Sequence, residues 1–404
     1  MQFDTKIAVV IRTDLEAWQK LNVAAFLTSG IAAKFPECIG EPYADGSGTN
    51  YLSLIGQPIL IYGAAGYSGR LATRACLELG LRPVLAGRTE ATVAAEAARQ
   101  GLPHRVFDLQ DAGRLDAGLA GMRAVLHMAG PYSQTGHLMA EACLRTGVHY
   151  LDITGETQVV ESFARLDQRA RERGVMLMPS VGFDVVPSDC LAAHVARHVP
   201  DACTLSIAMT SLAFITRGSA RTAMEAAGAG IGRRDGRIVP VGLASIERGF
   251  DFGAGPSACI NCTWGDVANA WYTTGIPNID VFFEGTPFLR TLLFLASTYA
   301  PLLRTPAGQA WLRAHVDMLP EGPSERKRRS THMVIVAQAS HPDGRRKTAR
   351  LRTPEAYTFT GTASAHVARR VIAGDFEPGF QTPGRVFGPD FVLSIPGVSR
   401  EDLD

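Results

Sequence analysis

The sequence lacks a charge excess of either sign. Its 404 residues include 40 lysines and arginines against 39 aspartates and glutamates, a net charge of +1. A chain that binds nucleic acid through its overall field would be strongly basic, so we expect no nucleic-acid partner. The only dense basic run, RKRR at residues 326–329, is expected to be a solvated loop.

Long hydrophobic runs are also missing. The most lipid-like segment, TLLFLASTYAPLL at residues 291–303, lies between Arg290 and Arg304. It is too short to span a bilayer, because a spanning helix needs about 20 apolar residues. We expect a buried helix, with peripheral docking to a membrane or to a lipid-carrying partner as the alternative. No N-terminal targeting signal is visible, because charged residues interrupt the first apolar run.

Cysteine is scarce and scattered. Of the seven cysteines, only Cys259 and Cys262 stand close together, in ACINCTWGD. A single CxxC without a second pair is weak evidence for zinc, and this one lacks the strand-then-helix context of a redox motif. We therefore expect no metal site and reduced thiols, which together with the missing signal predicts a cytoplasmic protein.

Lysine nearly disappears beyond residue 57. Residues 1–57 hold three lysines and one arginine, whereas the remaining residues hold two lysines and 34 arginines. Such a sharp change in composition indicates that the N-terminal segment has a different origin. Its pattern predicts a strand at KIAVVIRT, a helix from about Asp14 to Lys34 and a glycine-rich turn, which together form a βα extension.

From Pro58 to Pro187, short apolar runs alternate with amphipathic helical stretches. This alternation predicts an α/β fold: a Rossmann domain over residues 58–187 with a doubly wound parallel sheet. Beyond it the helices become fewer and the strands longer, which predicts a second, α+β domain over residues 188–404 on a mostly antiparallel sheet. Its C-terminal segment could pack back on the Rossmann domain. The expected strands of the first domain are 58–62, 82–86, 104–107, 124–128, 148–153 and 175–178.

The stretch PILIYGAAGYSGR sets three glycines between an apolar strand and a helix. Gly63 permits a tight turn, Gly66 lets backbone N–H groups approach a pyrophosphate, and Gly69 permits close helix–strand packing. Glycine also occurs in purely structural turns, but here a full set of βα units follows, so we predict a dinucleotide-binding turn. Its expected contacts are Gly63, Gly66, Tyr67, Ser68, Gly69 and Arg70.

The end of the second strand distinguishes the two nicotinamide cofactors. An NAD site places Asp or Glu there for the ribose 2′-hydroxyl, whereas this sequence has Gly87-Arg88. A guanidinium can bind a 2′-phosphate bidentately, so we predict NADPH as the cofactor. Arg88 as a solvated residue at a helix start is the alternative. Asp108, which ends the third strand, is expected to accept from the adenine amino group or to cap a helix.

The loops at the carboxyl ends of the later strands are expected to hold the reacting groups. Gly130-Pro131 would fix the backbone beside the nicotinamide. Tyr132, Glu156 and Asp184 are the candidate proton donors, although half-buried aromatics and helix caps give such residues an ordinary structural explanation. Two familiar mechanisms are excluded, because neither the Tyr-x-x-x-Lys of short-chain dehydrogenases nor the GxSxG of serine hydrolases occurs.

Several motifs carry a family resemblance, among them GAAGYSGR, AGPYSQTG, ACLRTGVHYLDITGE, PSVGFDVVPSD and PGFQTPGRVFGPDFVL. Over residues 58–392 the sequence resembles the saccharopine dehydrogenase-like oxidoreductases. Within that family it looks like the trans-acting enoyl reductases of mycobacterial-type lipid and polyketide synthesis. Residues 1–57 resemble the start of a family of uncharacterised domains thought to share the peptidyl-tRNA hydrolase II fold, with only about its first third present.

The resemblance implies a second domain that covers the nicotinamide and hydride transfer from NADPH to the double bond of an enoyl chain. Such reductases act on an acyl substrate presented by a polyketide or fatty-acid synthase. Because the second domain is rich in apolar residues, we expect an apolar small-molecule or carrier-bound acyl substrate. Saccharopine-type members instead reduce an imine and must hold two carboxylates, for which Arg217, Arg221, Arg233 and Arg234 are the evident cations. A non-catalytic dinucleotide sensor or scaffold is the third alternative, and the oligomeric state stays open.

Overall fold

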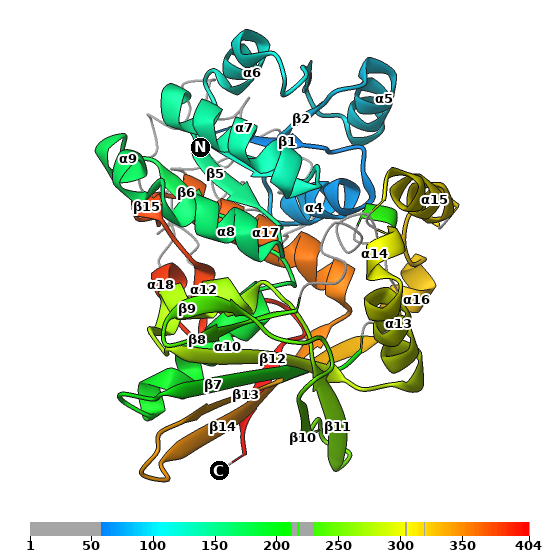
Figure 1. The fold of residues 1–404 in the computed structure, drawn as a ribbon. Coiled ribbons are helices and arrows are strands. Elements are labelled where there is room, and N and C mark those ends of the chain that lie inside the picture. The colour runs from blue at the N-terminus through cyan, green and yellow to red at the C-terminus, as the bar shows by residue number, and fades with distance from the viewer. Residues whose placement is uncertain (1–57, 212–215, 219–229, 304, 319, 404) are drawn as a thin grey trace, which may run out of the picture. The chain divides into compact units, whose positions relative to one another are not determined.

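The computed structural model describes residues 58–403 apart from 212–215, 219–229, 304 and 319. The chain divides into two compact units, Met1–Gln57 and Pro58–Asp404. The strand, helix and turn expected within the first unit lie outside the described residues. Two β-sheets organise the second unit (Figure 1).

The first sheet contains seven parallel strands in the order β15-β6-β5-β4-β1-β2-β3. Its central strands are apolar and buried, as expected of a parallel sheet that has helices on both faces. The predicted doubly wound α/β sheet is therefore confirmed. The strands are β1 (Ile59–Tyr62), β2 (Val84–Gly87), β3 (His104–Val106), β4 (Ala124–His127), β5 (His149–Asp152), β6 (Met176–Met178) and β15 (Gly379–Phe380).

Helices alternate with these strands. Along the chain they are α4 (Tyr67–Glu78), α5 (Glu90–Gln100), α6 (Ala112–Leu119), α7 (Tyr132–Thr146), α8 (Thr157–Ala164) and α9 (Asp167–Glu172). One layer contains α6, α7 and α8, since α7 packs against both of the others. In the other layer, α4 packs against α17 (Ala356–Ile372), which comes from the C-terminal region of the chain. Two helical layers thus enclose the sheet.

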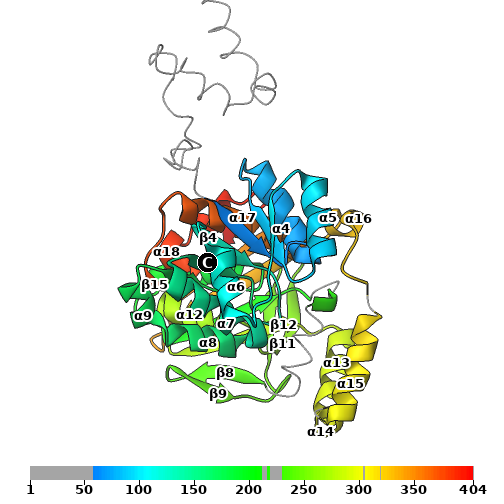
Figure 2. The same ribbon diagram turned by 90° about the horizontal axis from the view of Figure 1, so that it is seen from above.

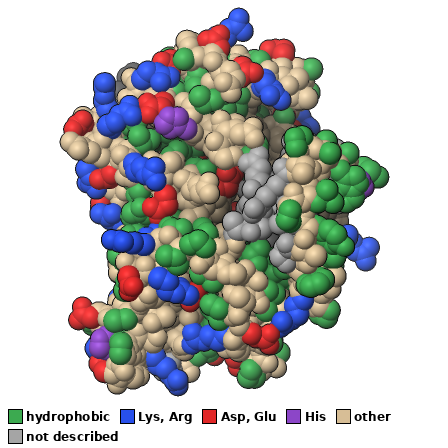
Figure 3. All heavy atoms as spheres, viewed as in Figure 1, with side chains coloured by type: hydrophobic (Ala, Val, Ile, Leu, Met, Phe, Trp, Pro, Cys, Tyr) green, Lys and Arg blue, Asp and Glu red, His purple; other side chains and the backbone are tan. Residues whose placement is uncertain are grey.

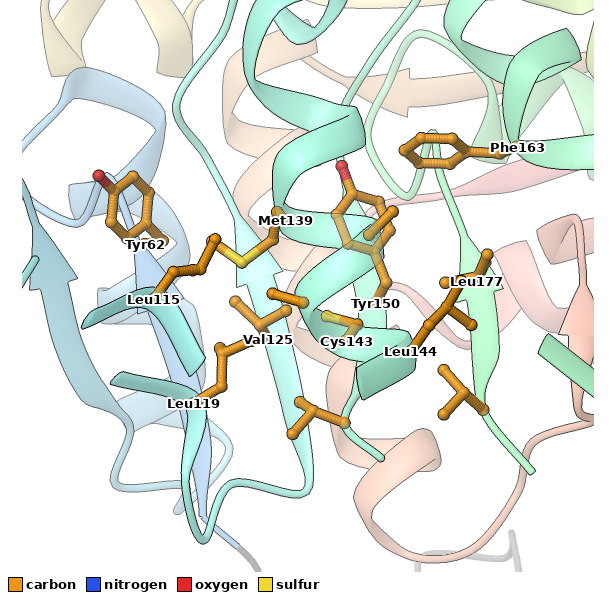
Figure 4. Close-up of a cluster of buried hydrophobic side chains, with 14 of the residues drawn as sticks. Tyr62, Leu115, Leu119, Val125, Met139, Cys143, Leu144, Tyr150, Phe163 and Leu177 are labelled. Atoms are coloured by element: carbon orange, nitrogen blue, oxygen red, sulfur yellow. The ribbon is translucent and has the colours of Figure 1, made fainter. Parts of the chain in front are cut away.

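A hydrophobic core fills the space between the sheet and the layer that contains α6 and α7 (Figure 4). On α7, Gly136, Met139 and Cys143 recur at spacings of three and four residues, which gives the helix one apolar face. Met139 and Tyr150 are both fully buried there, and Tyr150 stacks edge-on against Phe163 of α8. This packing sets the positions of the loops at the carboxyl ends of β4 and β5.

The second sheet contains nine strands, with the path β10-β11-β12-β7-β13-β14-β16 and the β8–β9 hairpin joined to β12. Its pairings are antiparallel except for β12 with β7, so the prediction of a mostly antiparallel sheet is confirmed. The strands are β7 (Thr204–Met209), β8 (Ile231–Arg234), β9 (Arg237–Pro240), β10 (Glu247–Asp251), β11 (Pro256–Asn261), β12 (Asn278–Glu284), β13 (His332–Ser340), β14 (Arg346–Pro354) and β16 (Ser399–Asp402).

Helices take a smaller share of the chain beyond Pro187 than before it, as expected, but several remain. This region includes α10 (Val186–His198), α12 (Asp266–Thr274), α17, α18 (Pro383–Phe387) and the 3-10 helix η3 (Phe391–Ser394). The α17 helix lies so close to α4 that a Cβ at Gly361 would stand 3.0 Å from the backbone of Leu71. After it, β15 pairs with β6 and extends the first sheet. The C-terminal region therefore contributes both a helix and a strand to the first sheet's surroundings.

The expectation that residues 291–303 form a buried helix is wrong. They belong to α13 (Pro287–Thr298) and α14 (Ala300–Leu303), which together with α15 (Pro306–Asp317) stand to one side of the second sheet (Figures 1 and 2). Phe294 is 67% exposed and Leu302 is 61% exposed. An apolar run predicts a helix, but hydropathy does not predict which element covers it. Within the part of the chain that the structure describes, no helix combines the length and hydropathy needed to cross a membrane.

The basic run at residues 326–329 is solvated, but it is not a loop. It lies in the short helix α16 (Glu325–Arg329), whose N-terminus is capped by the Ser324 hydroxyl accepting from the backbone N–H of Lys327. Serine is one of the residues preferred at the N-cap of a helix, so Ser324 explains why a helix begins here.

Candidate cofactor and substrate site

The three glycines of the predicted turn are each required by close backbone approach. Gly63 follows β1 with φ of +83°, and a Cβ there would lie 2.9 Å from the Cβ of Ala129. A Cβ at Gly69 would stand 2.2 Å from the carbonyl oxygen of Gly63. Gly66 is the N-cap of α4 and carries no side chain over the first N–H groups of that helix. The turn therefore offers an open helix N-terminus, which is a favourable place for a phosphate.

Tyr67 and Arg70, which were also predicted to contact the cofactor, direct their side chains to another segment of the chain. The hydroxyl of Tyr67 donates to the carbonyl of Pro323, and the guanidinium of Arg70 pairs with Glu321. Both side chains are therefore occupied by the segment that leads into α16, and only their backbone groups remain for a phosphate. Ser68 is half-buried.

The adenine end of the turn lies at the carboxyl ends of β2 and β3. Gly87 is buried, whereas Arg88 is exposed and makes no hydrogen bond or ion pair with any described residue. Asp108 is half-buried and accepts from the backbone N–H of Gln110 at 3.0 Å, so it stabilises its own turn. Burial raises the pKa of the nearby Tyr62 hydroxyl, the charge of Asp108 raises it further and the charge of Arg88 lowers it. Burial is the larger cause, and the pKa of Tyr62 is raised to about 12.

The loop after β4 is the one expected to lie beside the nicotinamide. The Gly130–Pro131 peptide is cis, and Thr135 donates its hydroxyl to the carbonyls of Ala129 and Pro131 at 2.8 and 2.9 Å. Tyr132 starts α7, but its hydroxyl is directed into the core, where it donates to the carbonyl of His127 at 3.2 Å. Burial raises the pKa of Tyr132 well above its usual value. The Tyr132 hydroxyl is therefore buried and engaged by the last carbonyl of β4.

Glu156 links the loops after β4 and β5. Its carboxylate accepts from the backbone N–H groups of Tyr132 and Ser133, both at 2.8 Å. These two groups are at the N-terminus of α7, which favours a negative charge. Glu156 thus caps a helix that begins 24 residues earlier in the chain, and it fixes the loop that contains Gly130 and Pro131.

Asp184 lies in the loop between β6 and α10, close to the loop after β5. It is half-buried, and one of its carboxylate oxygens would stand 2.9 Å from a Cβ placed at Gly155. No described residue forms a hydrogen bond or an ion pair with it. Burial without a compensating partner raises the pKa of Asp184 to about 7. Of the three candidate donors, Asp184 is the one whose carboxyl combines partial exposure with a pKa near neutrality.

Further buried carboxylates surround this loop and were not predicted as site residues. Asp152 is fully hydrogen-bonded: it accepts from the Tyr150 hydroxyl at 2.6 Å and from the N–H groups of Thr154 and Ser180. It therefore ties the ends of β5 and β6 together. Asp266, at the first turn of α12, has both oxygens buried without a hydrogen-bond partner, and burial raises its pKa well above the usual value.

Asp266 belongs to the run TWGD at residues 263–266, for which the sequence predicted no role. Trp264 and Gly265 pack onto the loop after β5: a Cβ at Gly265 would lie 3.3 Å from the Cα of Gly155, and the Trp264 carbonyl accepts from Thr157. The Trp264 indole N–H is buried without a partner. Among the described residues, no cluster of three or more His, Cys, Asp and Glu side chains could hold a metal ion.

Family comparison adds to this geometry. Residues 59–178 match the family described as the saccharopine dehydrogenase NADP binding domain, and residues 5–81 match one described as a protein of unknown function (DUF2000). The two matches overlap across β1 and α4. The apo saccharopine dehydrogenase (L-Glu forming) of Saccharomyces cerevisiae covers 86% of this chain and 100% of its own, with a TM-score of 0.57 and 15% identity. At that identity the likeness concerns the fold alone.

Two curated relatives are named trans-acting enoyl reductase. The one from Mycobacterium leprae is 34% identical over 149 residues, 35% of this chain and 36% of that protein. The one from Mycobacterium ulcerans is 30% identical over 162 residues, 38% of this chain and 39% of that protein. The chain thus aligns with little more than a third of the length of these relatives.

Proposed function

We propose that this chain belongs to the saccharopine dehydrogenase-like oxidoreductases and to their trans-acting enoyl reductase branch, and that it uses NADPH to reduce the double bond of an apolar acyl substrate. The resemblance of the sequence motifs is confirmed by the matched domain and relatives. These relatives support an oxidoreductase that depends on a nicotinamide dinucleotide. The choice of NADPH, the enoyl substrate and the reacting residues are the proposal.

The residues present fit a dinucleotide. A Cβ at Gly63 or Gly69 would collide with neighbouring atoms, so the backbone of the turn is closely packed, and the glycine at the start of α4 leaves room for a pyrophosphate. Gly63, Gly66 and Gly69 would bind the pyrophosphate through backbone N–H groups. Arg88 would bind the 2′-phosphate, because an exposed guanidinium without an internal partner can bind it bidentately.

The single observation that carries the proposed chemistry is Asp184, a half-buried carboxyl with a pKa of about 7 and no hydrogen-bond partner in the described chain. When bound, NADPH supplies a hydride, which carries one hydrogen and two electrons to one carbon of the double bond. Asp184 donates a proton to the neighbouring carbon, so the π bond is replaced by two C–H bonds. Partial exposure lets solvent return the proton afterwards.

The other candidate donors then have supporting roles. Glu156 positions the loop of Gly130 and Pro131 through the two N–H groups that it accepts from. Tyr132 anchors the same loop through its buried hydroxyl. Both groups are engaged by backbone atoms, so both are positioning residues in this proposal.

The imine-reducing alternative has less support. Two arginines of the expected carboxylate clamp are occupied internally: Arg233 is buried and pairs with Glu161, and Arg234 pairs with Asp280 at 2.8 Å. Arg221 lies outside the described residues. The names of the curated relatives favour the enoyl substrate, and a polyketide or fatty-acid synthase is the partner that would present it.

The test is direct. Purified protein is mixed with NADPH and a panel of enoyl thioesters of increasing chain length, and the absorbance of the reduced nicotinamide is followed. We expect the rate of NADPH oxidation to increase with the length of the apolar acyl chain of the substrate. Turnover with an amino acid and an aldehyde would assign the imine reaction instead. Tight NADPH binding without turnover on any substrate would assign a sensor.

A further inference from the structure

The surface of α13, α14 and α15 concentrates exposed apolar side chains (Figure 3). Of the nine large hydrophobic residues that are exposed in the described chain, seven lie between residues 288 and 318. Phe288 is 76% exposed and Met318 is 82% exposed. Contiguous exposed apolar surface marks an interaction site in a soluble protein. The seven, called the apolar face below, are Phe288, Phe294, Leu295, Tyr299, Leu302, Trp311 and Met318.

The seven side chains of the apolar face are exposed by 44–82%. In the described chain, α13 and α15 pack mainly against the short α14 between them. The base of α13 is held by Arg290, which donates to the carbonyl of Gly285 and pairs with Glu247 at 2.9 Å. Figure 2 shows the three helices standing out from the second sheet. The apolar face therefore points outward from a firmly attached base.

The net charge of this segment indicates which kind of surface the apolar face binds. Between residues 287 and 318 the sequence has three basic residues and one acidic one, a net charge of +2, and the four basic residues of α16 follow at 326–329. No charged residue interrupts 291–303. A segment that combines exposed Phe, Tyr, Trp and Leu with excess arginine and lysine has the composition of helices that lie in the interface of an anionic membrane.

A second copy of the chain fits the apolar face less well than an anionic membrane does. In a symmetric dimer each partner presents the same surface, so two segments of charge +2 would face each other. The dimensions also suit a membrane surface. The α13 helix has 12 residues, which corresponds to a length of about 18 Å and is suited to lying along an interface.

We propose that the apolar face of α13–α15 docks this protein onto the surface of an anionic phospholipid membrane. The aromatic and leucine side chains enter the boundary between headgroups and acyl chains, and the flanking basic residues contact the anionic headgroups. This inference does not depend on the reaction. The same helices continue into residues 321–328, which contact Tyr67 and Arg70 at the glycine turn. Docking would therefore hold the cofactor-binding end of the fold near the lipid.

The experiment is vesicle flotation of the full chain with two kinds of vesicle, phosphatidylcholine alone and phosphatidylcholine mixed with phosphatidylglycerol. We expect floating protein with the mixed vesicles and far less with the neutral ones. The double variant Phe294→Ser, Trp311→Ser should lower the partition coefficient at least about tenfold, because it removes two aromatic side chains from the interface. The matched control Leu393→Ser, an exposed apolar residue outside the apolar face, should float like the wild type.

Three outcomes would overturn the inference. Absence of flotation with either vesicle would reject membrane docking, and equal flotation with both would reject the anionic surface. Light scattering that finds a wild-type dimer, converted to monomer by the double variant, would assign the apolar face to a second copy. Circular dichroism of the variants verifies that they are folded, and NADPH binding serves as a separate readout that these substitutions should leave unchanged.

Discussion

Replacing Asp184 with asparagine is the sharpest test of the proposed chemistry, because it keeps the shape of the side chain and removes its proton. The pKa of Asp184 is about 7, against 3.8 for an ordinary aspartate. Near neutral pH roughly half of the molecules therefore carry the proton that the reaction needs. We expect Asp184→Asn to lower kcat at least about 100-fold, the usual contribution of a positioned general acid, with little change in NADPH affinity.

The same pKa predicts the pH dependence. The wild-type kcat should fall as pH rises through about 7, because Asp184 loses its proton, and Asp184→Asn should lack that limb. Glu156→Gln provides the comparison: it weakens the helix cap, and it should retain the wild-type decline above pH 7. A kcat for Asp184→Asn within about threefold of the wild type, or an unchanged pH profile, would refute Asp184 as the donor.

Stability gives an independent readout with a definite sign. Because the folded-state pKa is raised, the folded protein holds the Asp184 proton between pH 3.8 and about 7 while the unfolded chain releases it, so stability falls as pH rises through this window. The difference from 3.8 to about 7, at about 1.36 kcal/mol for each pH unit, gives an upper limit of about 4 kcal/mol. Solvent at the half-buried carboxyl lowers the effect below this limit. Urea unfolding at pH 8 should therefore find Asp184→Asn more stable than the wild type.

Three further substitutions test the cofactor site and the core. Arg88→Asp should weaken NADPH binding at least about tenfold and leave NADH binding nearly unchanged, as measured by calorimetry, because only NADPH carries the 2′-phosphate; an equal loss for both would remove Arg88 from that role. Gly69→Ala should abolish binding of both cofactors, because its Cβ would lie 2.2 Å from the Gly63 carbonyl oxygen and the backbone of the turn would have to open. Retained affinity would contradict binding of the pyrophosphate by this turn. Met139→Ala should lower the free energy of unfolding by about 2–5 kcal/mol in urea titration, since Met139 is fully buried, and a loss below about 1 kcal/mol would mean that the core relaxes around the gap.

The local pattern of the sequence was sufficient for the first sheet. Its central strands are short apolar runs buried on both faces, and its turns carry the glycines that a positive φ or a close backbone approach requires. These properties depend on a few neighbouring residues, so the strand positions and the GxxGxxG turn could be predicted with small errors at the ends. The place of Arg88 at the end of β2 followed from the same pattern.

Roles that depend on distant contacts could not be predicted this way. Glu156 was a candidate acid, but it caps α7, because Tyr132 and Ser133 lie within 2.8 Å only when β4 and β5 are neighbours. The Tyr132 hydroxyl points inward because α7 packs on the sheet with that side down. Even β15, a strand of two residues, joins the first sheet from the far end of the chain.

The sequence alone therefore determined which segments form strands and where the glycine turn lies, because short-range sterics and hydropathy govern both. The family to which the chain is similar followed from its motifs. Only the tertiary structure decided which carboxyl stays without a partner and which apolar helices stay uncovered. Both are properties of what surrounds a residue. Asp184 acquires its pKa from the loops around it, and α13 is exposed because no described element packs over its outer side.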